Sequence, residues 1–518
     1  MGGIIFNEDC NHFIYTRYRS HIKVGLKELH EFIDQYKGTG VTDFFLNVNA
    51  SIAWFPSKSR DDAFRNYDRI KKEGGNLDGE IPLSNGGYIE VLKDIYYEQG
   101  LNMYEIWISR LREIGINPWI SIRTNDVHNT NDENHFLHSS FFRENKEKRR
   151  GLHHTLGAGD YYDNALDFCY PEVREHLFSL VAEVLSKFDL YGLELDWMRE
   201  IYSLRIGREE QGAKLITELM ERIRKEADKA EKKWGHPIQI AARLPASPLL
   251  ALRLGFDFFD WIDKGLIDLL IVAPRWATSD NDMPIDLWKK MLSGKQVRLA
   301  AGQEILIDAM FTEPRKVILH NSIETARGTA AANLAMGADS VYLFNYMDDP
   351  SGKLPEFFGG QYLRMLKELG SQEALMDKPR RHVVTYCDVK APGVPHKNPL
   401  PVECAKRASG NPAFVGKPEY KTLRIPVGKV SPDAKMRLVL GVDENRKLTE
   451  ADFDVFLDAE KLNYIGKVTL PAPCYPGLEY HAFEIINKPD MPVAHIAEIA
   501  AMREPFTVEW AEIAINIE

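Results

Sequence analysis

The sequence predicts a (β/α)8 TIM barrel followed by a C-terminal all-β domain that resembles a sandwich. Short apolar runs alternate with segments of helical periodicity over residues 1–371, and eight such runs occur. Strands that alternate with helices pair in parallel, and eight repeats over this length fit a closed barrel better than an open sheet. Towards the C-terminal end the pattern changes to strand-like runs separated by turns, which favours an all-β domain.

Each expected barrel strand is a short, mainly apolar run. The expected strands are 3–7, 43–49, 118–125, 191–197, 238–244, 267–274, 297–303 and 340–345. The expected helices between and after them are 27–36, 103–114, 172–187, 211–233, 248–263, 284–292, 323–336 and 358–369. No Gly-x-Gly-x-x-Gly sequence follows an expected strand, which disfavours a dinucleotide-binding fold.

Two long connections interrupt the alternation of strands and helices. Residues 51–101 follow the second expected strand, and residues 126–167 follow the third. Both are strand-to-helix connections, which lie on the face of this fold that carries the chemistry. A disordered excursion is the alternative, but the second connection is rich in aromatic residues, so we expect it to be ordered and to wall a cleft.

The remaining chain divides into an extended segment and a compact domain. Residues 372–420 contain prolines and turn residues, so we expect a linker there with one strand at 382–388. Residues 421–518 contain the strand-like runs of the sandwich domain, at 422–427, 436–442, 453–457, 480–486 and 506–515. Such a domain beside a barrel is expected to support the barrel or to contact carbohydrate.

Composition narrows the classes of partner. The 518 residues carry a formal net charge of −11, which disfavours nucleic acid as a partner because phosphates require a basic face. The five cysteines lie far apart without a Cys-x-x-Cys pair, so neither a disulfide framework nor a zinc ribbon is expected. Neither a signal peptide nor a membrane-spanning run is visible. We therefore expect a cytoplasmic protein, with a leader peptide removed earlier as the alternative. The sequence does not define the oligomeric state.

Two carboxylates of the fourth expected strand are the sharpest functional signal. Because side chains alternate along a strand, Glu194 and Asp196 face the barrel axis while Leu193 and Leu195 face the helices. Buried carboxylates are costly unless they are paired or used. Asp196 lies at the carboxyl end of the strand, where barrel enzymes keep catalytic groups, and Glu194 lies one layer deeper. A structural ion pair with a nearby arginine is the alternative.

The seventh expected strand brings a third carboxylate, Glu304, to the same face. Glycoside hydrolysis requires one carboxyl group that protonates the leaving oxygen and a second that acts as nucleophile or base. We expect Asp196 to be the nucleophile or base, and Glu304 or Glu194 to be the proton donor. The expectation requires these groups to face an open, water-accessible bowl.

The other expected strand ends are polar and aromatic, as a ligand rich in hydroxyl groups requires. The expected substrate-binding residues are Asn47, Asn125, Asp126, His128, Trp197, Arg199, Arg243, Arg275, Trp276, Asn345 and Tyr346. The two arginines Arg243 and Arg275 could instead bind a carboxylate or sulfate of the ligand, or hold Asp196 or Glu194 ionised, and the last role is slightly favoured.

Cofactor chemistry has little support in the sequence. Five histidines gather in the second long connection (His128, His135, His138, His153 and His154), but they lack a His-x-His or His-Glu-x-x-His spacing. No Gly-x-Ser-x-Gly motif indicates a serine nucleophile, and no lysine is expected on an inward strand position. We therefore expect neither a metal nor another cofactor.

One stretch resembles a known family. Residues 166–177 and 182–199, which contain Pro-Glu-Val-Arg and then Tyr-Gly-Leu-Glu-Leu-Asp-Trp-Met-Arg, resemble the barrels called the "glycosyl hydrolase-like 10" group. Asp196 and Arg199 match the family pattern, whereas Tyr191 replaces an aspartate and Glu200-Ile201 replaces Tyr-Pro. The run from Pro118 resembles the third strand of the family. The resemblance implies a barrel hydrolase acting on glycosides, with Asp196 in the active site.

The sequence therefore predicts a glycoside hydrolase that cleaves an oligosaccharide, a polysaccharide or a simpler glycoside. Two alternatives keep the barrel. The first is a metal-assisted sugar isomerase, epimerase or lyase, which would bind a divalent metal tightly. The second is a non-catalytic barrel that binds carbohydrate and leaves it intact.

Overall fold

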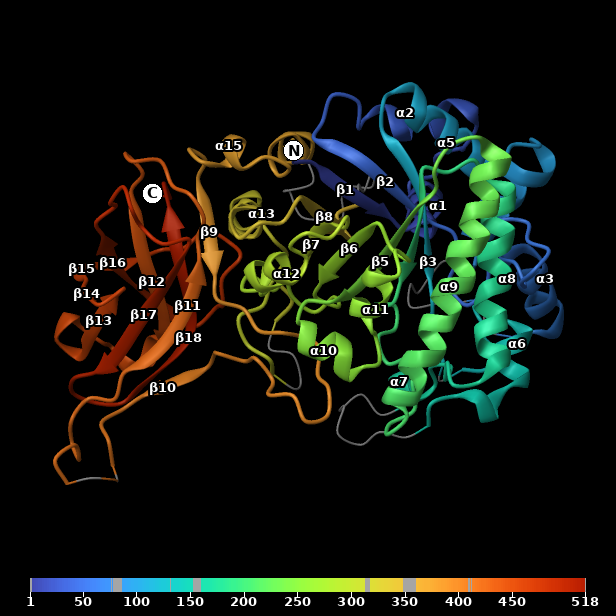
Figure 1. Ribbon diagram of the computed structural model, residues 1–518. Helices are drawn as coiled ribbons and strands as arrows, with labels where there is room; N and C mark the ends of the chain where they lie inside the picture. Colours follow the sequence, from blue (N-terminus) through green and yellow to red (C-terminus); the bar gives the residue numbers. More distant parts are fainter. Residues whose placement is uncertain are drawn as a thin grey trace.

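A computed structural model describes residues 2–75, 77, 86–130, 132–151, 160–312, 317–347, 360–408, 410 and 412–517. Its first part is a closed parallel barrel of eight strands in sequence order, as the sequence predicts (Figure 1). The barrel strands are β1 Ile4–Glu8, β2 Val41–Asn47, β3 Asn117–Arg123, β4 Gly192–Asp196, β5 Gln239–Pro245, β6 Leu269–Ala273, β7 Arg298–Glu304 and β8 Ser340–Phe344.

Helices around the barrel bury apolar side chains at helical spacing. The longest, α9 (Glu209–Trp234), buries Ile216, Met220, Ile223 and Ala227 and ends at Gly235 in a left-handed conformation. The other helices that follow or flank the barrel strands are α1 Cys10–Arg19, α2 Leu26–Asp34, α5 Met103–Glu113, α8 Pro171–Lys187, α10 Pro248–Arg253, α11 Phe258–Asp263, α12 Ile285–Met291, α13 Ile323–Ala335, α14 Tyr362–Glu368 and α15 Gln372–Leu375. Figure 1 shows α8 and α9 side by side at one edge of the molecule.

The two long connections contain secondary structure where they are described. The first carries α3 (Ala63–Glu73), α4 (Tyr88–Lys93) and a π-helical turn (Asp94–Glu98). The second carries α6 Ser140–Glu144, the 3-10 turn Lys146–Lys148 and α7 Asp160–Asp163. Phe136 and Phe142 of the second connection are buried. His153 and His154 of the expected histidine group, and the side chain of Tyr161, lie outside the described residues.

The C-terminal part is built from two antiparallel sheets around a second apolar core. The first sheet contains β9 Arg380–Val383, β10 Val402–Cys404, β12 Met436–Asp443, β15 Asn463–Val468, β16 Leu478–Ile485 and β18 Phe506–Ile515. The second contains β11 Lys421–Pro426, β13 Phe453–Leu457, β14 Glu460–Lys461 and β17 Ala494–Ala501. Residues 372–420 thus supply two strands, β9 and β10, which both pair with β18. Strand β9 lies slightly before the expected position 382–388.

The barrel and the β-domain are closely packed against each other. Helix α13 lies on β9, and a Cβ atom added to Gly328 would stand 1.9 Å from the carbonyl oxygen of Arg381. Arg381 forms a buried ion pair with Glu512, at 2.7 Å, on the β-domain side of this contact. A second contact joins the Tyr475 hydroxyl to the backbone amide of Ala309, at 3.0 Å.

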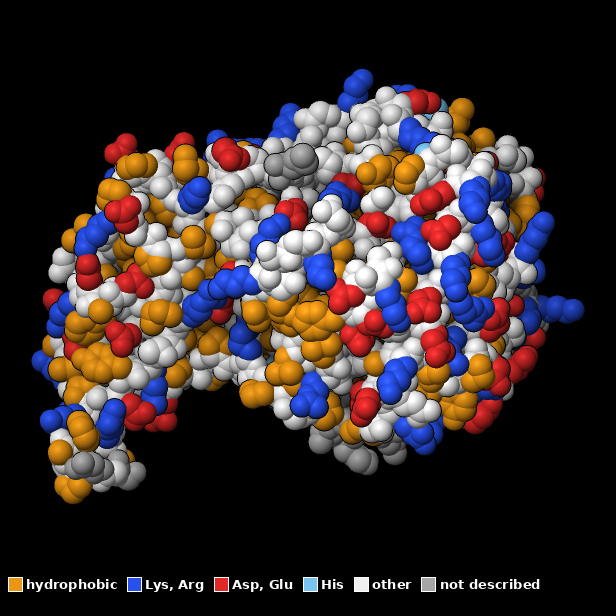
Figure 2. Space-filling model, viewed as in Figure 1, with side chains coloured by type: hydrophobic (Ala, Val, Ile, Leu, Met, Phe, Trp, Pro, Cys, Tyr) orange, Lys and Arg blue, Asp and Glu red, His pale blue; other side chains and the backbone are white. Residues whose placement is uncertain are grey.

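Among the described residues, no helix combines the length and apolarity that a bilayer crossing demands. Figure 2 shows acidic and basic side chains interspersed over the visible face, with apolar groups gathered mainly on the β-domain and near the middle of the molecule.

Candidate active site

The barrel interior changes from apolar to charged along its axis. The apolar layers contain Ile5, Phe45, Trp119, Ala241, Leu269, Ile271, Ala300, Tyr342 and Phe344. The next inward positions of β4 are Glu194 and Asp196. The carboxyl group of Glu194 bonds to Asn7 of β1, and that of Asp196 bonds to Arg243 of the adjacent strand β5. Strand alternation therefore aims both groups at the axis, as expected.

Asp196 forms an ion pair with Arg243 of the neighbouring strand β5. The distance from Nη1 of Arg243 to Oδ2 of Asp196 is 3.2 Å, and both side chains are 1% exposed. Arg243 also stacks over the ring of Phe344, 3.8 Å from its centre. Its Nη2 points towards the carbonyl oxygens of Pro274 and Arg275, at 3.3 and 3.5 Å. Of the alternative roles expected for Arg243, this geometry supports the ion pair.

Glu304 is the last residue of β7, and its Oε1 accepts a hydrogen bond from Nδ2 of Asn345. Burial raises the pKa of Glu304 well above its usual range, although Asn345 and the charges of Arg243 and Arg199 oppose the rise. Asn345 follows β8 with a φ of 62°, a left-handed conformation that is uncommon for a residue other than glycine. In this conformation the side-chain amide of Asn345 points towards Glu304.

Glu194 lies one layer deeper than Asp196 and is completely buried. Burial, followed by the charge of Asp196, raises the pKa of Glu194 to about 8. Asn7 of β1 donates an amide hydrogen to its Oε2 at 3.4 Å. A carboxyl group enclosed this far down the axis is poorly placed to reach a substrate, so its position fits a structural role better than a catalytic one.

A chain of charged groups lies beside these carboxylates at the ends of β1, β3 and β4. Arg123 bonds to Asp9 at 2.6 Å and to Asp126 at 3.3 Å. Asp126 lies 2.9 Å from Nδ1 of His128, and the other ring nitrogen lies 2.7 Å from Nη2 of Arg199. Although burial alone would raise the pKa of Asp126, the charges of His128, Arg123 and Arg199 hold it well below its usual range.

Four of the expected substrate-binding residues bond to other parts of the protein or lie away from the barrel axis. Trp197 is fully buried in the main core, 5.3 Å from the ring of Phe168, because it is the outward neighbour of Asp196. Tyr346 is equally buried in that core. The amide of Asn125 both donates to and accepts from the backbone of Leu166. For Trp197, Tyr346 and Asn125, these contacts favour a structural role over direct contact with substrate.

The fourth such residue, Asn47, faces the axis beside Ser121, whose carbonyl oxygen accepts its amide at 3.4 Å. It is 2% exposed. Its register partner Ser121 is in turn the partner of Glu194. Asn47 thus belongs to the enclosed layer of Glu194 and not to the end of the barrel.

The connection after β6 carries the remaining two expected residues. Arg275 is bonded to Glu200, with Nε 2.7 Å from Oε2, and its guanidinium lies 4.7 Å from the ring centre of Tyr162. Trp276 is 37% exposed. It is the most exposed of the expected aromatic ligands, because Trp197 and Tyr346 are fully buried.

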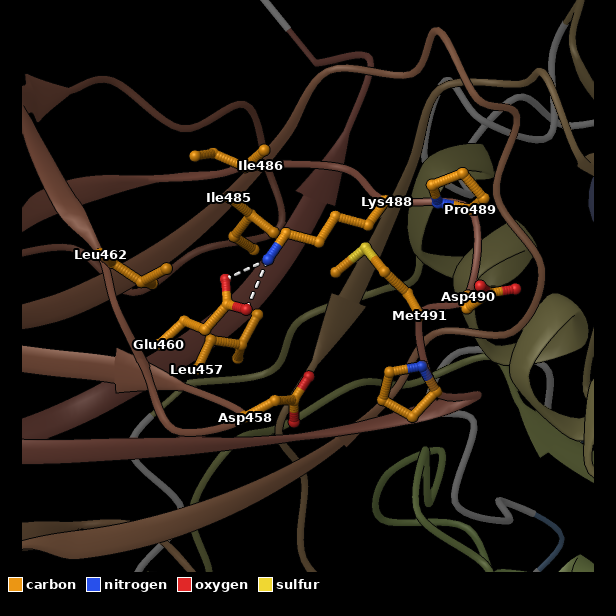
Figure 3. Close-up of a pocket in the computed structure, with 11 residues that line it drawn as sticks. Leu457, Asp458, Glu460, Leu462, Ile485, Ile486, Lys488, Pro489, Asp490 and Met491 are labelled. Atoms are coloured by element: carbon orange, nitrogen blue, oxygen red, sulfur yellow. Dashed lines mark hydrogen bonds and ion pairs between the residues drawn. The ribbon is translucent and has the colours of Figure 1, made fainter.

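The expected open bowl is not observed. Asp196 and Glu304 are each 1% exposed, and Glu194 is fully covered. A cavity of about 430 Å³ lies in the β-domain, where it is lined by apolar residues such as Leu457 and Met491 and crossed by an ion pair between Lys488 and Glu460 (Figure 3). None of the expected catalytic residues lines it. Within the described ranges, no group of three or more His, Cys, Asp or Glu side chains is arranged to hold a metal.

One residue at this end of the barrel was not anticipated from the sequence. Asp388 is the last residue of the strand expected at 382–388 within the linker, yet its carboxylate accepts hydrogen bonds from the loop after β6. Its charge also acts on Glu304. A single aspartate at the end of an expected strand carries no local signal of such a role.

Comparisons with known proteins give a limited result. No family model matches the chain, and no curated protein matches it, so the resemblance to the glycosyl hydrolase-like 10 group remains an expectation. Similar solved structures include α-L-fucosidase isoenzyme 2 of Paenibacillus thiaminolyticus, with 14% identity, 73% of this chain and 51% of that chain covered, and a TM-score of 0.41. This chain thus spans about half the length of that enzyme.

Two further structures are matched over nearly their whole length. Isoenzyme 1 of the same organism is 11% identical over 96% of each chain, with a TM-score of 0.35. A family GH18 chitinase of Chromobacterium violaceum is 10% identical over 98% of this chain and 91% of its own, with a TM-score of 0.36. The solved structures to which this chain is similar thus include glycoside hydrolases, at low identity and low TM-score.

Proposed function

We propose that the protein is a glycoside hydrolase in which Asp196 acts as the carboxylate and Glu304 as the proton donor. One observation carries the proposal: one buried carboxylate is paired with an arginine, and a second carboxyl group near the same arginine has a raised pKa. Asp196 is ion-paired with Arg243, whereas burial raises the pKa of Glu304. A carboxyl group that keeps its proton and a second, charge-paired carboxylate are what the acid and base chemistry of glycoside cleavage requires.

The two groups would divide the cleavage between them. Glu304 would transfer its proton to the leaving glycosidic oxygen while the bond to the anomeric carbon breaks. Asp196 would either accept a proton from the water that attacks that carbon, or bond to the carbon itself as the glycosidic bond breaks. In the second route, water deprotonated by Glu304 would then cleave the ester and release the sugar and Asp196. Trp276 would stack on a sugar ring beside the site.

Both carboxyl groups are covered in this conformation, so the proposal requires the side chains above them to move when a glycan binds. A positive result would establish this access. Labelling of Asp196 by a glycoside carrying a reactive leaving group, located by peptide mass spectrometry, would show that a glycan reaches this carboxylate.

The activity test compares the wild type with Asp196→Asn on a panel of aryl glycosides and oligosaccharides. We expect loss of turnover by at least about 10³-fold, as for the removal of a catalytic carboxylate. Asp189→Asn is the matched control, because Asp189 forms an exposed ion pair with Arg112 outside the barrel interior. Retention of activity in Asp196→Asn, with normal folding, would overturn the proposal.

A second candidate is a barrel that binds carbohydrate without cleaving it. The near-complete burial of Asp196 and Glu304 is the observation that favours it. Calorimetric titration of the same oligosaccharides separates the two candidates. Binding that leaves the glycan intact over long incubation would support the non-catalytic barrel and count against hydrolysis.

A further inference from the structure

The carboxylate of Asp388 is bound by three consecutive backbone amides. Oδ1 accepts from the amide of Arg275 at 2.9 Å, and Oδ2 accepts from those of Trp276 and Ala277 at 2.8 and 2.7 Å. Successive backbone amides that converge on one anion form a favourable, charge-assisted site. The loop after β6 is therefore fixed from outside the barrel.

The same loop contacts the proposed catalytic groups on its other side. The carbonyl oxygens of Pro274 and Arg275 lie near Nη2 of Arg243, which pairs with Asp196. The side chain of Arg275 bonds to Glu200, in the connection after β4. The loop thus lies between Asp388 and the ion pair of Asp196, and it also presents Trp276 to solvent.

The segment that carries Asp388 is anchored to the barrel at several points. Thr385 accepts the backbone amide of Asn281 at 2.9 Å, and Lys397 pairs with Asp280. The hydroxyl of Tyr202 donates to the carbonyl oxygen of Lys390 at 2.9 Å. In Figure 1 this orange segment leaves β9, passes beside α10 and returns to β10. The anchors place Asp388 at the barrel end without help from a regular element.

We propose that Asp388 is a positioning residue for the active site, supplied by the segment between the barrel and the β-domain. It fixes the loop at residues 275–277 so that the carbonyl oxygens of Pro274 and Arg275 orient Arg243 towards Asp196. The catalytic part of this inference rests on the proposed hydrolase function. The fixing of the loop does not.

The first experiment needs no activity. Amide hydrogen exchange is followed by mass spectrometry in peptides spanning 275–277, in the full-length wild type and in Asp388→Asn. We expect exchange there to accelerate at least about tenfold, because hydrogen bonds to a charged acceptor are replaced by weaker ones. Asp286→Asn, in the exposed first turn of α12, should leave these peptides unchanged. Unchanged exchange in Asp388→Asn would overturn the proposal.

The second experiment uses the pH dependence of kcat/KM. The groups that act on Glu304 are Asn345 and Tyr346 after β8, Arg243 of β5, Arg199 after β4, and Asp388. Removing the negative charge of Asp388 should let Glu304 lose its proton more readily, so the basic limb should move to lower pH. We also expect kcat/KM to fall at least about tenfold. A merely structural contact would leave the basic limb unmoved.

The two experiments keep the two claims apart. If the wild type cleaves no glycoside, the hydrolase proposal fails, and hydrogen exchange alone decides whether Asp388 fixes the loop. If the wild type is active and Asp388→Asn loosens the loop without changing kcat/KM or its pH profile, the positioning role is refuted. Asp388→Glu keeps the charge but displaces the carboxylate by one methylene, and it replaces Asp388→Asn if that variant does not fold.

Discussion

Arg243 holds Asp196 at 3.2 Å in an ion pair from which water is almost completely excluded. The guanidinium also covers the ring of Phe344 on the far side of the interior, 3.8 Å from the ring centre. One arginine therefore packs on Phe344 and neutralises the buried charge of Asp196. Removing it would change packing and electrostatics together.

Arg243→Met should destabilise the protein strongly. It leaves the Asp196 carboxylate buried without its partner, which costs about 3 to 5 kcal/mol in comparable cases. Urea unfolding followed by fluorescence gives the free energy of unfolding. Asp196→Asn added to Arg243→Met should recover part of the loss, because an amide tolerates burial better than a charge. Absence of any recovery would show that packing on Phe344, and not the ion pair, is the dominant contribution.

Glu304→Gln should abolish the basic limb of the pH–rate profile. Since burial raises the pKa of Glu304, this group remains protonated to a higher pH than an exposed glutamate, and activity should decline as pH rises through that pKa. The variant should retain activity only towards substrates whose leaving groups need no proton. A full profile of kcat/KM on two aryl glycosides of different leaving-group acidity would measure this. An unaltered basic limb would assign the proton donor elsewhere.

Glu194→Gln should make the protein more stable at alkaline pH. The pKa of Glu194 is raised to about 8 in the folded state, so the folded state binds a proton more tightly than the unfolded state does. The stability that this proton provides is present below the ordinary glutamate pKa and is lost as pH rises towards 8. Melting temperatures at pH 5 and pH 8.5 should therefore converge in Glu194→Gln. An equal difference in wild type and variant would contradict the raised pKa.

Asn345 offers a matched pair of substitutions. Asn345→Gly keeps the backbone at φ 62° free of strain but removes the amide that bonds to Glu304. Asn345→Ala removes the same amide and adds a conformational cost of about 1 kcal/mol or more. We expect both to lower activity equally and only the alanine variant to lose the additional stability. Equal stabilities would show that the backbone relaxes out of the left-handed conformation.

The barrel was predictable because its signals are local. Apolar runs at strand length and the alternation of Glu194 with Leu193 and Leu195 need only neighbouring residues to be recognised. Trp197 adjoins Asp196 in sequence, but strand alternation turns adjacent side chains to opposite faces, and Trp197 is fully buried in the main core. A strand end that looks aromatic in the sequence can therefore turn its aromatic side chain away from the axis.

Other features depend on contacts that no local pattern encodes. Asn125 has an amide suited to a sugar, but its partner Leu166 is brought to it by the path of a long connection. Asp388 is separated from Arg275 by 113 residues. The burial of Asp196 and Glu304 likewise results from tertiary packing. The sequence therefore predicts water-accessible carboxyl groups where the structure has buried ones.

The seam between Gly328 and Arg381 has a consequence for how this protein can evolve. Any side chain at position 328 of α13 would collide with the backbone of β9. The barrel and the β-domain therefore pack together only when this position is glycine. Replacement of either half by a module from another lineage would break that fit. We therefore expect the halves to have been inherited together, and gene trees built separately from residues 1–371 and 372–518 should branch in the same order.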